Sequence, residues 1–302
     1  MATNIRRMNG EKVSVVAPLR YYEYTSEQSG TRFSLSAAVD FFAEAGFDGV
    51  DVSLENITLL EDAWQSVLYS MGNRAASKGL CMPVCHLPFF MPDPDDESAM
   101  KRFTATVRQG IEAADLLKIR RAVIHPIVRH SSKKTYAQFM QQNVDYLTPL
   151  CDMAAARGIA LLLENMPGKP YKNVNDDIAY GSRAEDIAHL CDTVKIGACW
   201  DFGHAHLTGL RQSEALAVMG DRIAWAHVHD NDGFRDSHLI PYAGGIDWED
   251  AMKGLQTIRF LDRSGNWLDL ELKGSGLAAD RCIRLDHAAR AISAARVLVS
   301  HL

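Results

Sequence analysis

Short apolar segments alternate with longer amphipathic segments along the whole chain. The apolar segments are rich in Val, Ile, Leu and Ala and lack strict polar alternation, which is typical of strands buried on both faces of a parallel sheet. On this basis eight strands are predicted, at Val13–Ala17, Gly49–Ser53, Cys81–His86, Arg121–His125, Ile159–Glu164, Lys195–Trp200, Ile223–His229 and Trp267–Leu272.

The segments between these strands have the length and periodicity of helices. Eight helices are predicted, at Ser34–Ala45, Leu59–Lys78, Glu97–Leu117, Tyr136–Arg157, Arg183–Asp192, Ser213–Gly220, Trp248–Leu255 and Asp280–Val299. Pro83 lies inside the third predicted strand, where it would cost a ladder hydrogen bond unless a bulge is present. Eight strand-helix units without a linker or repeat predict an α/β fold, a single (βα)8 TIM barrel over residues 1–302.

The composition is that of an ordinary globular protein, with 47% hydrophobic and 23% charged residues among 302. The net charge is −6, from 32 Lys and Arg against 38 Asp and Glu, and no basic block is present, so nucleic-acid binding is disfavoured. The longest aliphatic stretch, Ile159–Leu163, is too short to span a membrane. Six cysteines form no CxxC pair, which favours reduced, buried thiols and a cytoplasmic location.

Acidic and imidazole side chains gather at the carboxyl ends of the predicted strands, where TIM barrels carry their active sites. Glu164, Asp201, His227 and Glu271 come from four successive strands and would project toward one point at the barrel mouth. Three carboxylates cannot share a small cavity fully ionised unless a cation neutralises them. Mixed imidazole and carboxylate ligands suit Mn, Co, Zn or Fe better than Ca or Mg. Seven of the 11 histidines also lie in or just after predicted strands: His86, His125, His204, His206, His227, His229 and His238.

Simpler structural roles remain open for several of these residues. Glu164 is also compatible with a buried carboxylate paired with Arg or Lys, and Asp201 with a helix N-cap. Lys273, two residues after Glu271, is a candidate substrate contact or a salt-bridge partner. Cys85 and Cys199 show no feature of an activated thiolate, so both are assigned to core packing.

A series of short motifs extends through nearly the whole chain. The motifs are Gly46-Phe-Asp-Gly-Val-Asp51, His86-Leu-Pro, His125-Pro, Glu164-Asn165, Asp201-x-x-His204, His227-x-x-Asp230, Asp236-x-His238-Leu and the final Glu271. In their order and spacing, the chain resembles the xylose-isomerase-like TIM-barrel superfamily, which groups sugar phosphate isomerases and epimerases with endonuclease-IV-type AP endonucleases.

This resemblance implies roles for particular residues. In tagatose-epimerase-like members, one metal ion is held by two glutamates, an aspartate and a histidine, which correspond here to Glu164, Glu271, Asp201 and His227. The same glutamates serve as catalytic acid and base, and His204 would bind a substrate hydroxyl. One divalent ion is therefore expected. The AP endonucleases hold up to three zinc ions with further ligands, whose counterparts are His86, His125, His204, Asp236 and His238.

The leading hypothesis is a metal-dependent isomerase or epimerase. It would act on a sugar, inositol or keto-polyol by proton transfer through a metal-stabilised enediolate, and a closely related dehydratase would share the first step. We expect a small-molecule substrate and no membrane association, and homo-oligomerisation remains open. The candidate substrate contacts are His86, His125, Arg129, Tyr171 and Lys273.

Two other classes of function compete with this hypothesis. One is a multi-zinc phosphoesterase of the AP-endonuclease type, in which Arg129 and Arg235 would contact phosphate. The acidic net charge favours the sugar hypothesis over it. The other is a metal-free binding barrel, which leaves the convergent carboxylates unexplained. Aromatic loops at Arg20–Tyr24, Leu87–Pro92 and Lys169–Tyr171 would either stack on a sugar or simply cover the barrel mouth.

Overall fold

Eight parallel strands form a closed ring in this computed structural model, which describes residues 5–6, 10–21, 35–54, 63–128, 135–168, 181–273, 280–300 and 302. Each strand is hydrogen-bonded to the next in sequence order, and the last pairs with the first of the eight to close the barrel. The predicted TIM barrel is thereby confirmed. The eight strands are β2 (Lys12–Pro18), β3 (Gly49–Ser53), β4 (Cys81–His86), β5 (Arg121–Ile124), β6 (Ala160–Glu164), β7 (Gly197–Asp201), β8 (Ile223–His227) and β9 (Trp267–Asp269).

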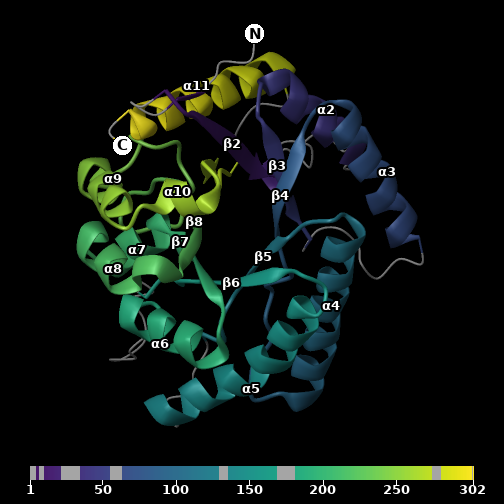
Figure 1. Cartoon of the computed structure of the whole chain (residues 1–302), viewed down its shortest axis with the longest axis vertical. Coiled ribbons are helices and arrows are strands. Elements are labelled where there is room, and N and C mark those ends of the chain that lie inside the picture. Colours follow the sequence, from purple (N-terminus) through teal and green to yellow (C-terminus); the bar gives the residue numbers. More distant parts are fainter. Residues whose placement is uncertain are drawn as a thin grey trace.

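Helices surround the ring of strands (Figure 1). The helices are α2 (Leu35–Ala45), α3 (Trp64–Ser77), α4 (Glu97–Leu116), α5 (Tyr136–Ala155), α6 (Ala184–Val194), α7 (Phe202–Thr208), α8 (Gln212–Met219), the 3-10 turn η2 (Gly220–Arg222), α9 (Trp248–Thr257), α10 (Phe260–Ser264) and α11 (Arg281–Val299). The first residues of the predicted Leu59–Lys78 helix lie outside the described residues.

Four short elements are absent from the predictions. They are α7, α10, the 3-10 turn η2 and the two-residue strand β1 (Ile5–Arg6), which pairs antiparallel with β2. Elements of two to seven residues are shorter than the segment over which hydrophobic periodicity can be recognised.

Two strands end two or three residues earlier than predicted. The predicted strand Ile223–His229 stops at His227, because the backbone of Asp230 pairs instead with Leu239 in an antiparallel bridge. The predicted strand Trp267–Leu272 stops at Asp269, and the amide of Leu272 turns back to the carbonyl of Leu270 at 2.8 Å. The polar residues that follow these strands therefore lie on loops at the barrel mouth.

Pro83 is accommodated by an irregularity in β4. Gly49 of β3 faces Cys81, whereas Asp51 faces Val84, so β4 carries one extra residue between these two pairs. At this bulge no backbone N–H is needed for the sheet hydrogen bonds, so Pro83, which has none, is accommodated as predicted.

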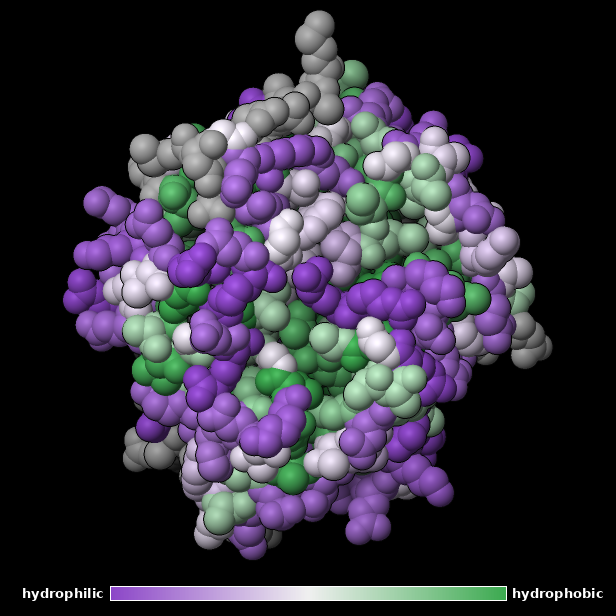
Figure 2. All heavy atoms as spheres, viewed as in Figure 1, coloured by the Kyte–Doolittle hydropathy of each residue, from purple (hydrophilic) through white to green (hydrophobic). Residues whose placement is uncertain are grey.

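The interior of the barrel is closed by a layer of apolar side chains. This plug consists of Val16, Val84, Val123, Leu162, Cys199 and Trp225, each at most 1% exposed. A larger apolar layer fills the space between the strands and the helices. Along the view of Figure 2, hydrophilic residues dominate the periphery and hydrophobic residues show toward the middle of the face. None of the described helices combines the length and apolar character needed to cross a membrane.

Candidate metal centre

The side chains above the plug are polar. Their position in the barrel interior is explained by the two-residue period of the strands. Successive side chains of a strand point to opposite faces, so a residue two positions beyond a plug residue points into the same barrel interior. On five strands that residue is acidic or imidazole: His86, His125, Glu164, Asp201 and His227 follow Val84, Val123, Leu162, Cys199 and Trp225. The barrel thus places a charged layer directly above an apolar one.

The four predicted metal ligands meet in this polar layer. Glu164, Asp201, His227 and Glu271 are all at most 2% exposed, and each offers a ligand atom within 4.8 Å of the others. Nδ1 of His227 lies 3.4 Å from Oε1 of Glu164, 3.2 Å from Oε2 of Glu271 and 3.8 Å from Oδ2 of Asp201. The sequence prediction that these residues converge at one end of the barrel agrees with this arrangement.

The chemistry of these four residues fits a divalent ion. Nδ1 of His227 and Oε2 of Glu271 are buried and have no hydrogen-bond partner within the described part of the chain. Buried polar atoms without partners are costly, and a cation placed among these atoms would satisfy both and offset three carboxylate charges. One nitrogen and several oxygen donors are a ligand set for a transition ion such as Zn or Mn.

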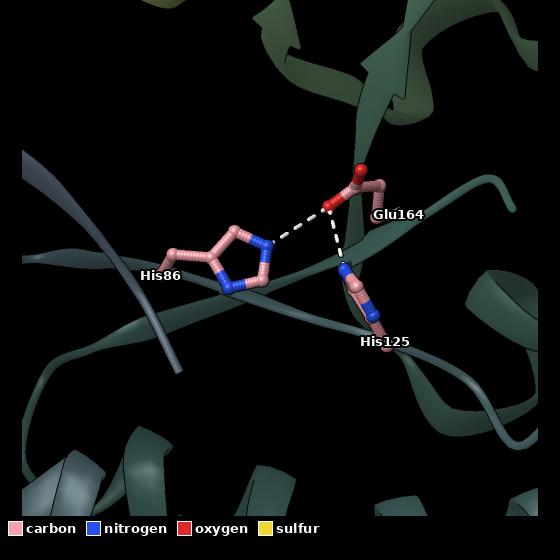
Figure 3. A group of neighbouring side chains, drawn as sticks. All are labelled: His86, His125 and Glu164. Atoms are coloured by element: carbon pink, nitrogen blue, oxygen red, sulfur yellow. Dashed lines mark hydrogen bonds and ion pairs between the residues drawn. The ribbon is translucent and has the colours of Figure 1, made fainter. Parts of the chain in front are cut away.

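Glu164 is surrounded by histidines rather than by the Arg or Lys of the alternative role. Its Oε2 lies 3.1 Å from Nε2 of His86 and 3.2 Å from Nε2 of His125, and both rings point at this one oxygen (Figure 3). Its Oε1 lies 3.2 Å from Nδ1 of His204. Burial alone would raise the pKa of Glu164, but His227, His125 and the hydrogen bonds to its carboxylate hold it well below its usual range. Glu164 is therefore an anion at neutral pH.

Asp201 is the helix N-cap that the sequence allowed, and its other carboxylate oxygen faces the candidate metal ligands. As the N-cap of α7, its Oδ1 accepts a hydrogen bond from the backbone N–H of His204 at 2.6 Å. Its Oδ2 faces the metal-ligand cluster and also lies 3.0 Å from Nε2 of His229. Burial opposes its ionisation, yet His204 and His229 lower the pKa of Asp201 to about 2. Asn165 fixes this strand end by bonding the amide of Asp201 at 2.7 Å.

Three histidines of the site, His86, His204 and His238, have their Nδ1 atoms bonded to backbone carbonyls. Nδ1 of His86 donates to the carbonyl of Leu87 at 2.9 Å, and Nδ1 of His238 donates to the carbonyl of Glu271 at 2.6 Å. In His86 and His238, Nε2 then faces a carboxylate, that of Glu164 at 3.1 Å and that of Asp236 at 2.9 Å respectively. A carbonyl that fixes the tautomer in this way is the usual companion of a metal-ligating histidine.

A second group of potential ligands lies beside the first. It consists of His229, Asp236 and His238, whose ligand atoms also lie within 4.8 Å of one another. The rings of His229 and His238 stack with centroids 3.9 Å apart. His204, which the resemblance gives among the further ligands, is not in this group, and its Nδ1 bonds to the carbonyl of Asn165. The only sequence signal for His229 is its place two residues after His227.

The sequence reasoning also missed two buried aspartates below the cluster. Asp51 and Asp269 form a further group with His227, and Asp269 accepts a hydrogen bond from Nε1 of Trp225 at 2.9 Å. Burial raises the pKa of Asp269. The sequence does indicate that Asp269 points inward, because it lies two residues before Glu271.

The polar layer is the floor of an open pocket of about 530 Å³. Three of the candidate substrate contacts, His86, His125 and Lys273, line this pocket. Lys273 also forms a salt bridge, the second role considered for it, because its Nζ lies 3.2 Å from Oδ2 of Asp236. Arg235 is exposed. Arg129 and Tyr171 lie outside the described residues, as does the loop Lys169–Tyr171.

The buried cysteines near the mouth behave as core residues. Burial raises the pKa of Cys199 to about 12 and that of Cys85 well above its usual value. Neither thiol is an activated nucleophile at neutral pH, which agrees with the predicted packing role.

Most of the chain matches one known family. Residues 39–298 match the family described as xylose isomerase-like TIM barrel. The chain belongs to this family.

The proteins similar to this chain include an inosose isomerase and a protein resembling a sugar epimerase. Inosose isomerase from Bacillus subtilis is 24% identical over 173 residues, which cover 55% of this chain and 60% of that protein. A D-tagatose 3-epimerase-like protein superposes with a TM-score of 0.69 at 22% identity, covering 93% of this chain and 97% of that one. The IolI protein with a bound zinc atom superposes with a TM-score of 0.71 at 19% identity, covering 95% and 98%. At these identities the superpositions establish the shared fold.

Proposed function

We propose that the protein is a metal-dependent isomerase or epimerase acting on a sugar, an inositol or a related keto-polyol. The observation that carries this proposal is the pair of buried, unpartnered atoms, Nδ1 of His227 and Oε2 of Glu271, in a cluster with two further carboxylates. The sugar and inosose enzymes among the compared proteins support the substrate class.

Glu164, Asp201, His227 and Glu271 would hold the ion, and Mn, Co, Zn or Fe suits this ligand set. When bound, the ion would polarise the carbonyl of the substrate and so acidify the adjacent C–H bond. We expect one ion, since Arg20 and Lys273 already form ion pairs with two carboxylates of the pocket, Glu271 and Asp236.

Glu164 and Glu271 would exchange the proton at carbon. They come from β6 and from the loop after β9, so they reach the pocket from different sides of the barrel. His86 and His125 hold Oε2 of Glu164 from one side, which leaves its position fixed relative to the substrate. His204, which also lines the pocket, would orient a substrate hydroxyl.

A multi-zinc phosphoesterase is the second candidate. Two observations favour it, namely the His86, His125 and Glu164 group and the His229, Asp236 and His238 group, both of which could hold additional ions. Such an enzyme activates hydroxide for attack on phosphorus and leaves carbon-bound hydrogens untouched.

Isotope exchange separates the two candidates. The enzyme, loaded with Mn²⁺ or Zn²⁺, is incubated in D₂O with 2-keto-myo-inositol, D-fructose or D-tagatose, and deuterium at the carbon next to the carbonyl is followed by NMR. We expect exchange that is lost in Glu164→Gln and no cleavage of abasic-site DNA. Metal-dependent nicking of abasic DNA that disappears in His238→Ala, without exchange at carbon, would establish the phosphoesterase instead.

A further inference from the structure

Arg20 is a pocket residue to which the sequence assigned no separate chemistry. It lies two residues beyond Pro18, the last residue of β2, at the mouth end of the barrel. Its side chain is about nine-tenths buried and lines the pocket. Its guanidinium carbon lies 5.5 Å from the ring centroid of Phe89, in cation-π geometry.

The guanidinium of Arg20 divides the two oxygens of Glu271 between different partners. Nη2 of Arg20 forms an ion pair with Oε1 of Glu271. Oε2 points the other way, 3.2 Å from Nδ1 of His227, where it has no hydrogen-bond partner. One oxygen is therefore engaged by the protein, and the other faces the proposed ion.

We propose that Arg20 is a positioning residue that restricts Glu271 to a single oxygen toward the ion and keeps part of the coordination sphere open for the substrate. The inference rests on the proposed metal-dependent function. A carboxylate that bound through both oxygens would occupy two positions, whereas a catalytic ion needs a free one.

The charge of Arg20 has a second effect, on affinity. A fixed positive charge beside a metal ligand repels a divalent ion, and the repulsion is strong in a buried site of low dielectric constant. Arg20 therefore weakens metal binding while it supports turnover. A purely structural arginine would not separate these two quantities.

Two substitutions and a matched control test this proposal. Arg20→Met removes the charge and the donors, and Arg20→Lys keeps the charge without the planar fork. Arg121→Met is the control, because the guanidinium carbon of Arg121 also lies 5.5 Å from an aromatic ring, that of Trp225, but belongs to the first residue of β5, at the end of the strand away from the mouth. Zn²⁺ affinity is measured by competition with a chromophoric chelator, and kcat and KM by the exchange reaction.

We expect Arg20→Met to bind Zn²⁺ at least about tenfold more tightly and to lower kcat at least about a hundredfold. A crystal structure of the zinc-loaded variant should show both oxygens of Glu271 at bonding distance. Arg20→Lys should keep the wild-type affinity within about threefold, and Arg121→Met should change neither affinity nor kcat.

Unchanged or weaker Zn²⁺ binding by folded Arg20→Met would overturn the proposal. If Arg20→Met does not fold, Arg20→Gln, which keeps a donor but not the charge, must show the same tighter binding, and its failure to do so is equally decisive. Absence of metal binding by the wild-type protein would instead refute the proposed function itself, so the two failures are distinguishable.

Discussion

Two layers of the barrel interior, two residues apart along the same strands, have opposite characters. The plug layer holds Val, Leu, Cys and Trp side chains, and the layer above it holds His, Glu and Asp. Both are almost completely buried. Burial has opposite effects on their free energies. Removal of the apolar side chains from water stabilises the folded protein, whereas removal of the charged side chains from water destabilises it unless they have partners. The lower layer thus supports the fold, and under the proposed function the upper layer is completed by an ion.

The first way to sharpen this comparison is to change one residue of each layer on a single strand, β6. Glu164→Gln removes one anionic ligand and the proposed base, so we expect catalysis to fall roughly a thousandfold or more. The variant should remain folded, because the amide is nearly isosteric with the carboxylate. Steady-state exchange kinetics and circular dichroism check both statements, and retained activity would remove Glu164 from the chemistry.

Leu162→Ala, two residues earlier, should have the complementary effect. Leu162 is 1% exposed in the plug, so the cavity left by its truncation should lower the free energy of unfolding by about 2–5 kcal/mol. Activity per folded molecule should stay near the wild-type value. Denaturant titration measures the first quantity; a large loss of kcat without loss of stability would contradict the division between the layers.

Much of this division could be predicted from the sequence, because a strand has a two-residue period and TIM barrels place their chemistry at one end of the strands. Eight strands and the convergence of Glu164, Asp201, His227 and Glu271 follow from these two facts. The ion pair of Arg20 could not be predicted, because it depends on barrel closure between β2 and β9, residues far apart in the sequence. His229 was missed because the loop after β8, not the strand, sets its position.

Removal of the metal should test the dependence of the upper layer on an ion. An ion that binds only the folded protein stabilises it by about 3–4 kcal/mol when present at a few hundred times its dissociation constant. For a chain of this length that corresponds to a rise in Tm of about 5 °C. Calorimetry before and after chelation measures this change in Tm, with Glu271→Gln as a variant expected to bind the ion more weakly. Equal Tm values for the metal-loaded and the chelated wild-type protein would speak against a bound ion.

The smallest expected effect concerns pH and the metal-free protein. Burial lowers the pKa of His125 to about 4, despite the opposing effect of Glu164. The folded form therefore binds fewer protons than the unfolded chain below about pH 6.5, so this histidine contributes stability above that pH and loses it as the pH falls toward 4. His125→Gln should accordingly lose about 2 kcal/mol less stability than the wild type between pH 7 and pH 5. Denaturant unfolding of both proteins at pH 7 and at pH 5 measures this difference. If the two proteins lose the same stability, His125 has an ordinary pKa.

The central claim is that a divalent ion sits where the four ligands of the polar layer meet. Anomalous diffraction from crystals grown with Zn²⁺ or Mn²⁺ tests it most directly. We predict one strong peak bounded by Glu164, Asp201, His227 and Glu271, and no comparable peak at His229, Asp236 and His238, where Lys273 already compensates the aspartate. Absence of a peak among the first four residues, at a metal concentration that supports activity, would contradict the account.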